Sequence, residues 1–361
     1  MTLATPQQKI VRVPHLLNAI DDSLATWLKE HGQGAYRATQ IRHWLFVRRA
    51  SDFQEMTELG QTLRNELAAE FSLWTTSIVR HTQADDGTEK LLLALTDGGQ
   101  IECVLLRDEV RRTICISTQV GCGMGCVFCA SGLDGLERNL TTGEIVEQML
   151  RLLRLLGPDE RLSHVVVMGM GEPLANLDNL LPALDEASRE DGLGISARRI
   201  TISTVGLPKP MRRLADAGAR YRLAVSLHAP NEALRREIVP VGEKISLAEI
   251  LAEADHYFDL SGRQLTFEYV LLAGINDSPE HAHELARLLG RRTALVNVIP
   301  FNPVSGLPYR TPSTSARQTF RHVLEDHGLA VRFRHKKGDA IDAACGQLRR
   351  RTLQQISSLK A

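Results

Sequence analysis

Apolar residues recur with a helical period over the first part of the chain. Between residues 14 and 31 they are spaced mostly by three or four positions, which predicts an amphipathic helix. A second helix is expected from about Tyr36 and a third from about Leu59 to Phe71. The second directs four apolar side chains inward, namely Ile41, Trp44, Leu45 and Val47. These segments predict a small helical domain over residues 1–90, which ends in a linker to the next region.

From Lys90 onward the pattern changes to short apolar strands. Three of them, 91–95, 101–106 and 112–117, come first, and the turn Asp97-Gly98-Gly99 joins the first two as a hairpin. Strands then alternate with helical stretches such as 142–156 and 279–289, and the further strands are 164–169, 199–204, 221–227, 265–272 and 294–299. Counting the strand at 112–117, this gives six βα units. The sequence therefore predicts an α/β fold, a parallel sheet curved into a partial (βα)6 barrel over residues 91–361, with chemistry at the carboxyl ends of its strands.

Composition adds two constraints. The chain has 361 residues, 43% of them hydrophobic, which is enough for a large core. No apolar run approaches the ~20 residues that a bilayer span needs, and residues 1–20 lack the apolar core of a signal peptide. We therefore expect a cytoplasmic protein that does not enter a membrane.

The overall charge is zero, with 43 basic and 43 acidic residues, so nothing draws the whole molecule to nucleic acid. Two stretches are nevertheless basic. Residues 31–50 contain four arginines and no acid, and residues 331–361 contain eight lysines and arginines against Asp339 and Asp342. Either stretch could neutralise phosphates. For the N-terminal stretch, composition alone favours an ordinary packing domain with a charged face.

The segment 113–130 carries the most specific motif of the chain. Cys122, Cys126 and Cys129 follow a C-x3-C-x2-C spacing, and glycines at 121, 123 and 125 allow the backbone to turn tightly. A structural zinc site would need a fourth ligand, and a disulfide framework is disfavoured by the low cysteine content. Three cysteines suit a 4Fe-4S cluster in which one iron lacks a protein ligand, whereas such clusters usually have four cysteines.

This triplet, with Phe128 just before its last cysteine, resembles the motif of the radical S-adenosylmethionine (SAM) superfamily. The resemblance implies that the open iron binds SAM and that electron transfer splits SAM into methionine and a 5'-deoxyadenosyl radical. Phe128 is expected to cover the cluster as an apolar side chain. The superfamily motif does not indicate a substrate.

Several predicted strands end in small and polar residues. These ends are 168–173 (Met-Gly-Met-Gly-Glu-Pro), 203–206 (Ser-Thr-Val-Gly), 226–230 (Ser-Leu-His-Ala-Pro) and 299–303 (Ile-Pro-Phe-Asn-Pro). Each alone is typical of an ordinary turn, but four of them at one barrel mouth indicate a ligand site. In the first, Glu172 is a candidate acceptor for the ammonium group of a ligand.

Three cysteines lie outside the triplet. Cys103 is expected to be an inert buried side chain, Cys115 lies on the strand before the cluster motif, and Cys345 is flanked by small residues that would let a bulky partner approach. From the residues alone, an inert role and a reactive role both remain open for Cys345.

Further motifs extend the resemblance along nearly the whole chain. They are G-M-G-E-P-L-x-N at 169–176, S-L-H-A-P-N at 226–231, E-Y-V-L-L at 268–272, N-V-I-P-F-N-P at 297–303 and I-D-A-A-C-G-Q-L at 341–348. Together with the cysteine triplet they resemble the RlmN/Cfr family of RNA adenine methyltransferases. The resemblance implies RNA as the partner, 23S rRNA and also tRNA, an electron donor such as flavodoxin or ferredoxin, and two SAM molecules per turnover.

The family pattern also implies roles for individual residues. Cys122, Cys126 and Cys129 would hold the 4Fe-4S cluster. Cys345 would carry a methyl group, Cys115 would release the RNA adduct through a transient disulfide, and Glu102 would accept the ring proton. Seven residues would bind SAM: Gly171, Glu172, Ser203, Ser226, Leu227, His228 and Asn302.

Some points stay open at this stage. The motifs favour methylation of adenosine C2, with C8, as in Cfr, as the alternative, and a noncatalytic iron-sulfur RNA-binding or redox-sensing protein is an alternative of another class. The sequence also departs from the family pattern at Ala340, where aspartate is usual, and at Lys337, where arginine is common. Asp339 is a candidate to replace the missing aspartate, and the firmness of the Cys345 loop depends on it.

Overall fold

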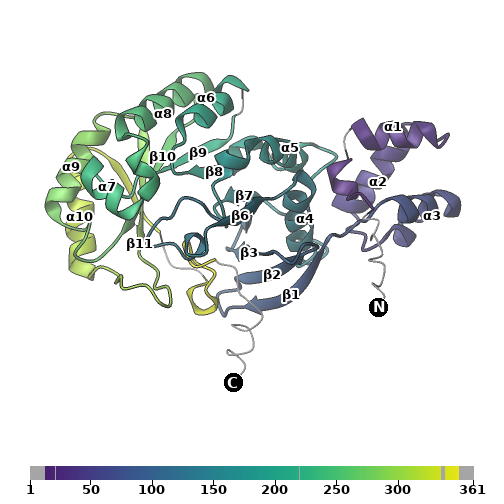
Figure 1. The fold of residues 1–361 in the computed structure, drawn as a ribbon, viewed down its shortest axis with the longest axis horizontal. Coiled ribbons are helices and arrows are strands. Elements are labelled where there is room, and N and C mark those ends of the chain that lie inside the picture. Colours follow the sequence, from purple (N-terminus) through teal and green to yellow (C-terminus); the bar gives the residue numbers. More distant parts are fainter. Residues whose placement is uncertain (1–12, 21, 219, 335–337, 349–361) are drawn as a thin grey trace, which may run out of the picture.

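A single curved sheet organises the molecule (Figure 1). The computed structural model describes residues 13–20, 22–218, 220–334 and 338–348. Its ten-stranded sheet has the order β1-β2-β3-β4-β7-β8-β9-β10-β11-β12. The strands are β1 (Thr76–Gln83), β2 (Glu89–Leu95), β3 (Gln100–Arg107), β4 (Arg112–Cys115), β7 (His164–Val167), β8 (Ile200–Thr204), β9 (Arg222–Ser226), β10 (Leu265–Leu271), β11 (Ala294–Pro300) and β12 (Ala330–Phe333).

The strands from β4 to β12 pair in parallel, whereas β1, β2 and β3 extend the sheet in antiparallel fashion. The six predicted βα strands are all present and adjacent, and the predicted hairpin joins β2 to β3. The sequence missed two strands of this sheet, β1 and β12. Both lack a run of buried apolar residues, because each lies at an edge of the sheet with much of its length exposed. A separate ribbon outside this sheet pairs β5 (Gln119–Gly121) with β6 (Leu136–Asn139), two short strands that the sequence also missed.

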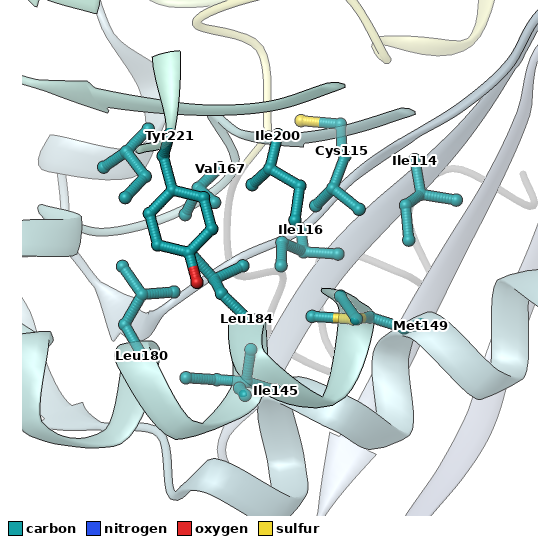
Figure 2. Packing of buried hydrophobic residues seen from close by; sticks show 14 of the residues in the cluster. Ile114, Cys115, Ile116, Ile145, Met149, Val167, Leu180, Leu184, Ile200 and Tyr221 are labelled. Carbon is teal, nitrogen blue, oxygen red and sulfur yellow. The ribbon is translucent and has the colours of Figure 1, made fainter. Parts of the chain in front are cut away.

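Helices cover the outer face of the parallel strands, as Figure 1 shows. They are α4 (Thr142–Leu153), α5 (Leu177–Ser188), α6 (Pro208–Asp216), α7 (Glu232–Ile238), α8 (Leu247–Ser261), α9 (Pro279–Leu289) and α10 (Thr314–Asp326). Strand residues such as Ile114 and Ile200 pack against Ile145 of α4 and Leu184 of α5 (Figure 2). In the same view the sulfur of Cys115 points away from this apolar layer, because neighbouring side chains of a strand alternate between its faces. Among the described residues, no helix has the length and apolar character needed to cross a bilayer.

The N-terminal domain consists of α1 (Asp22–Glu30), α2 (Tyr36–Phe46), α3 (Gln61–Glu70) and short 3-10 turns. The helix predicted over 14–31 is not continuous, since Leu16–Asn18 forms a separate 3-10 turn. The six apolar side chains of the predicted helix are nevertheless all buried: Leu16, Leu17, Ile20, Leu24, Trp27 and Leu28. The inward orientation predicted for Val47 is wrong. Because α2 ends at Phe46, Val47 lies beyond the helix and is 56% exposed.

Buried polar contacts attach this domain to the barrel. Arg42 of α2, itself buried, contacts Glu186 at 2.5 Å and Asp191 at 2.9 Å, at the end of α5 and just after it. In α4, the fully buried carboxylate of Glu147 accepts hydrogen bonds from the backbone N–H and hydroxyl groups of both Thr75 and Thr76. The connection between the two domains is therefore held by satisfied buried charges.

We expect Glu147→Ala to lower the free energy of unfolding by about 3 kcal/mol, because it leaves the donors of Thr75 and Thr76 buried without an acceptor. Urea unfolding followed by circular dichroism measures this. The exposed Glu237 on α7 gives the matched control, and Glu237→Ala should change stability by no more than about 0.5 kcal/mol. Equal effects of the two variants would contradict the role assigned to Glu147.

Candidate active site

The three cysteines of the triplet line one cavity at the carboxyl ends of the strands. Cys122 follows β5, and Cys129 precedes a 3-10 turn at Ala130–Gly132. The bend is possible because Gly121 has a φ of 76°, and a Cβ atom there would lie 2.0 Å from the carbonyl oxygen of Gly135. Burial raises the pKa of the Cys122 thiol to about 12. Burial raises the pKa of Cys126 further, and the neighbouring thiols add to it.

These thiols suit a cluster better than a single ion. In the described part of the chain, no three His, Cys, Asp or Glu side chains are arranged to hold one metal ion. A 4Fe-4S cube instead takes each cysteine on a different iron, so its ligands surround a cavity and do not meet at one point. Thiols that are partly buried and whose pKa is raised ionise readily only when a cation compensates their charge, and iron would supply such a cation. Phe128 is buried, lines the same cavity and packs edge-on against His228, with ring centroids 4.8 Å apart.

Glu172 lies in the same cavity, at the Gly-Glu-Pro turn after β7. Its carboxylate accepts hydrogen bonds from the backbone N–H groups of Leu174 (3.0 Å) and Val205 (2.9 Å). Burial raises the pKa of Glu172, while these bonds oppose the shift. Gly171 is required beside it, since its φ is 102° and a Cβ would lie 2.6 Å from the Cβ of Gln119. The carboxylate is thus fixed and able to accept a further donor.

The ends of β8 and β9 contribute the next side chains. The hydroxyls of Ser203 and Ser226 lie 3.4 Å apart on the cavity wall. His228 has a φ of 61°, and its Nδ1 accepts the backbone N–H of Val270 at 3.0 Å. Burial lowers the pKa of His228 to about 3, and the charge of Arg235 contributes, so the ring is neutral with its other nitrogen as a donor. Leu227 differs from these residues, because its side chain lies in the apolar core and not on the cavity wall.

Asn302 joins this cavity to the Cys345 loop. Its Nδ2 donates to the carbonyl oxygen of Cys345 at 3.1 Å, while its buried Oδ1 has no hydrogen-bond partner among the described residues. A buried acceptor without a partner is costly, so this atom is a natural contact for a polar ligand. The cavity thus offers a neutral acceptor (Asn302), an acidic acceptor (Glu172), two serine hydroxyls and an N–H donor of His228. These groups match the amino acid and ribose groups of SAM.

Cys115 and Cys345 line a second cavity of about 300 Å³ next to the first. The two cavities share Met168, Ile299, Asn302, Arg334 and Cys345 in their walls. Burial raises the pKa of Cys115 to about 12, and Cys345 adds to the shift. The structure therefore brings together the two cysteines that the sequence placed far apart.

Arg334 is a site residue that sequence reasoning missed. It lies in both cavity walls just after β12, and the Cys345 thiol is the main group that raises its pKa, followed by Glu268 and Cys115. Glu268 of β10 also lines the cluster cavity and accepts two bonds from Asn297. The only available signal was the basic composition of 331–361, which was interpreted as a surface for RNA.

The Cys345 loop is held at several points without the aspartate missing at position 340. The carbonyl of Gly346 accepts from Ala130 N–H at 2.7 Å, and Lys90 Nζ donates to the carbonyl of Asp342 at 2.9 Å. Ala340 itself is exposed beside this contact. Lys337 lies outside the described residues, and the side chain of Asp339 is not described.

Glu102 is not part of the cavity that contains the two cysteines. It lies on β3 with its carboxylate 3.0 Å from Lys90 Nζ, next to residues 340–342 of the Cys345 loop. Val104, two residues further along the same face of β3, does line that cavity. Glu102 is therefore one strand repeat, about 7 Å, from the cavity wall, beneath the loop.

The partial barrel, with a three-cysteine loop facing a SAM-compatible cavity, defines a radical SAM protein. A family model described as the radical SAM superfamily matches residues 116–288. A second model, the N-terminal domain of ribosomal RNA large subunit methyltransferase N, matches residues 15–73.

Similar proteins narrow the class to one family. A probable dual-specificity RNA methyltransferase RlmN from Rhodopirellula baltica is 61% identical over 94% of this chain and 91% of its own. The corresponding protein of Symbiobacterium thermophilum is 46% identical over 91% of this chain and 90% of its own. The crystal structure of a radical SAM methyltransferase from Sphaerobacter thermophilus, 42% identical, covers 93% of this chain and 99% of its own with a TM-score of 0.90. The chain belongs to the RlmN family.

We expect His228 to make folding pH-dependent. An unfolded histidine has a pKa of ~6.5, whereas burial and Arg235 lower the pKa in the fold to about 3. As the pH falls from ~6.5 toward ~3, the unfolded chain gains a proton that the folded chain does not, so stability is lost over this window. Between pH 7 and pH 4.5, metal-free wild type should lose about 2 kcal/mol more than His228→Asn, a substitution that tolerates the positive φ. Urea unfolding at both pH values measures this, and equal losses would refute it.

Proposed function

We propose that this protein methylates C2 of an adenosine in 23S rRNA and in tRNA through a methyl group carried on Cys345. The observation that supports this most is the shared cavity of Cys115 and Cys345 beside the cluster cavity. The names of the relatives, dual-specificity RNA methyltransferases, agree with both RNA classes. We place the reaction in the cytoplasm, with flavodoxin or ferredoxin as the electron donor.

Bound SAM and the 4Fe-4S cluster on Cys122, Cys126 and Cys129 would supply a methyl group and then a 5'-deoxyadenosyl radical, using two SAM molecules per turnover. Seven residues would bind SAM: Gly171, Glu172, Ser203, Ser226, Leu227, His228 and Asn302. Leu227 would act through its backbone position, since its side chain is in the core. Its backbone N–H is already paired with the carbonyl of Glu268 at 3.0 Å.

Cys345 would accept the methyl group as a thiolate. Arg334 lines both cavities together with Cys345, so a fixed positive charge belongs to the same walls as this sulfur. Asn302 fixes the loop through the Cys345 carbonyl, so the sulfur stays at the boundary of the two cavities. A carbon-centred route is needed because an adenine ring carbon is not nucleophilic and cannot attack the methyl group of SAM directly.

Cys115 would then release the product. Once the former methyl carbon joins Cys345 to the adenine, the adduct would give up its ring proton and one electron, which balances the electron spent on cleaving SAM. The Cys115 thiolate then attacks the sulfur of Cys345, an S–S bond forms, and the C–S bond breaks with its electron pair going to the product carbon, which takes up a proton. An external thiol reductant returns both cysteines to the reduced state. Glu102 would accept the ring proton, which requires residues 340–342 to move off it.

The RNA base must leave its stack to enter this cavity. A surface for the surrounding RNA lies on α2, where Tyr36 is 60% exposed and Arg37 lies 4.9 Å from its ring centroid. Arg48 is exposed and lies 6.0 Å from the ring centroid of Trp44. Aromatic rings with adjacent guanidinium groups are the usual platform for unstacked bases.

Substitution of the two cysteines tests the proposed reaction. We expect Cys115→Ala to accumulate a covalent protein–RNA species that shifts on a denaturing gel and disappears with RNase, because nothing releases the adduct. Cys345→Ala should form no such species, and both variants should lack 2-methyladenosine in nucleoside mass spectrometry. The buried Cys103 provides the matched control, and Cys103→Ala should behave as wild type. An adduct on Cys345→Ala would refute the carrier role, and 8-methyladenosine would move the reaction to C8.

Replacement of Tyr36 tests the RNA surface. Loss of one stacking ring costs about 1–3 kcal/mol, so Tyr36→Ala should weaken RNA binding by about tenfold in a filter-binding assay. Val110, which is 86% exposed on the β3–β4 turn, serves as the control, and Val110→Ala should leave binding unchanged. Unchanged affinity of Tyr36→Ala would exclude this surface.

A further inference from the structure

Arg235 of α7 has the largest side chain among those that are fully buried in the described residues. Its guanidinium donates to three backbone carbonyls: Val205 at 2.7 Å, Ser226 at 3.0 Å and Leu227. These carbonyls lie at the carboxyl ends of β8 and β9, next to Ser203 and His228 in the wall of the cluster cavity. One side chain thus connects two strand ends from behind the cavity wall.

The positive charge of Arg235 has no acidic partner nearby. Within the described residues, no carboxylate lies within ion-pair distance of it, and its Nε has no hydrogen-bond partner. The acid that acts on it from a distance is Glu232, whose Oε1 is occupied by the N–H of Leu247 at 2.6 Å. A buried cation without a counter-charge is costly. Among the described residues, this charge is therefore met by backbone carbonyls and the more distant Glu232, and a bound anionic group would balance it further.

The cluster loop packs on the segment that follows Arg235. Val127 N–H donates to the carbonyl of Ile238 at 3.1 Å, and a Cβ on Gly125 would lie 3.7 Å from Pro240. Cys126 lies between these two contacts in the sequence. Consistent with this placement, the charge of Arg235 lowers the pKa of Cys126, against the larger effects of burial and the other thiols that raise it.

A cluster held by thiolates carries net negative charge, and each electron it accepts adds to that charge. A fixed cation in a low-dielectric interior stabilises the more negative state. We propose that Arg235 is a positioning residue with two effects: its charge raises the reduction potential of the cluster, and its three carbonyl contacts hold the strand ends that bind SAM. This inference rests on the cluster site described above and not on the identity of the RNA product.

Variants at this position separate charge from shape. Arg235→Gln removes the charge, and in an EPR-monitored titration the ratio of reduced to oxidised cluster at a fixed potential should fall about tenfold, which is 59 mV for one electron. Arg235→Lys keeps the charge but loses the planar fork. For Arg235→Lys, the ratio of reduced to oxidised cluster at the same fixed potential should change less than threefold. The SAM dissociation constant of this variant should rise about tenfold in equilibrium dialysis.

Arg236, the next residue on α7, is exposed and gives the matched control, so Arg236→Gln should leave the potential and SAM affinity unchanged. A loaded Arg235→Gln protein with the wild-type potential would refute the electrostatic effect. If Arg235→Gln does not take up a cluster, Arg235→Lys decides the question. A tenfold fall in the ratio of reduced to oxidised cluster in Arg235→Lys would show that the charge at this position does not set the reduction potential. Wild-type SAM affinity in Arg235→Lys would refute the effect on the strand ends. All of these measurements are made without RNA, so they stand apart from the methylation reaction itself.

Discussion

The gathering of three partly buried thiols in one cavity wall is the constraint on which the site depends. Removal from water raises the pKa of each, and other thiols raise it further: members of the triplet for Cys122 and Cys126, and Cys345 for Cys129. Such thiols become ligands only when positive charge compensates them, and the metal must supply most of it. The surrounding structure is consistent with this demand: the buried ring of Phe128 adds apolar surface to the cavity wall, Gly121 permits the tight turn of the loop, and the buried Arg235 places a cation behind the wall.

In the proposed reaction, one of the two adjoining cavities would hold the cofactor and the other would hold the methyl carrier. Asn302, Arg334 and Cys345 belong to both walls, so the Cys345 sulfur would not need to travel far between the two. Glu102 does not reach the cavity of the two cysteines in this structure, since it pairs with Lys90 next to the Cys345 loop. The same lysine also holds Asp342 of that loop, so displacement of the loop and exposure of Glu102 are physically linked.

Much of this could be predicted from the sequence, because the informative features were local. The six parallel strands are buried apolar runs, and the cluster loop and strand-end motifs have fixed spacings. Features set by tertiary contact were missed. Strand β12 is half exposed, Arg235 and Arg334 resemble ordinary surface arginines in sequence, and Val47 falls outside its helix because α2 ends one residue earlier. The pairing of Cys115 with Cys345 came from family resemblance, since nothing local joins residues so far apart in the chain.

That long separation has a consequence for biosynthesis. The strand with Cys115 is made early, whereas the loop with Cys345 follows the last strand of the sheet. Contacts between distant parts of a chain form late, because they must close the longest loops. During translation, the strands from β4 to β11 can thus assemble before Cys345 is made. In the proposed reaction, a nascent chain at that stage would still lack the sulfur that becomes joined to the RNA.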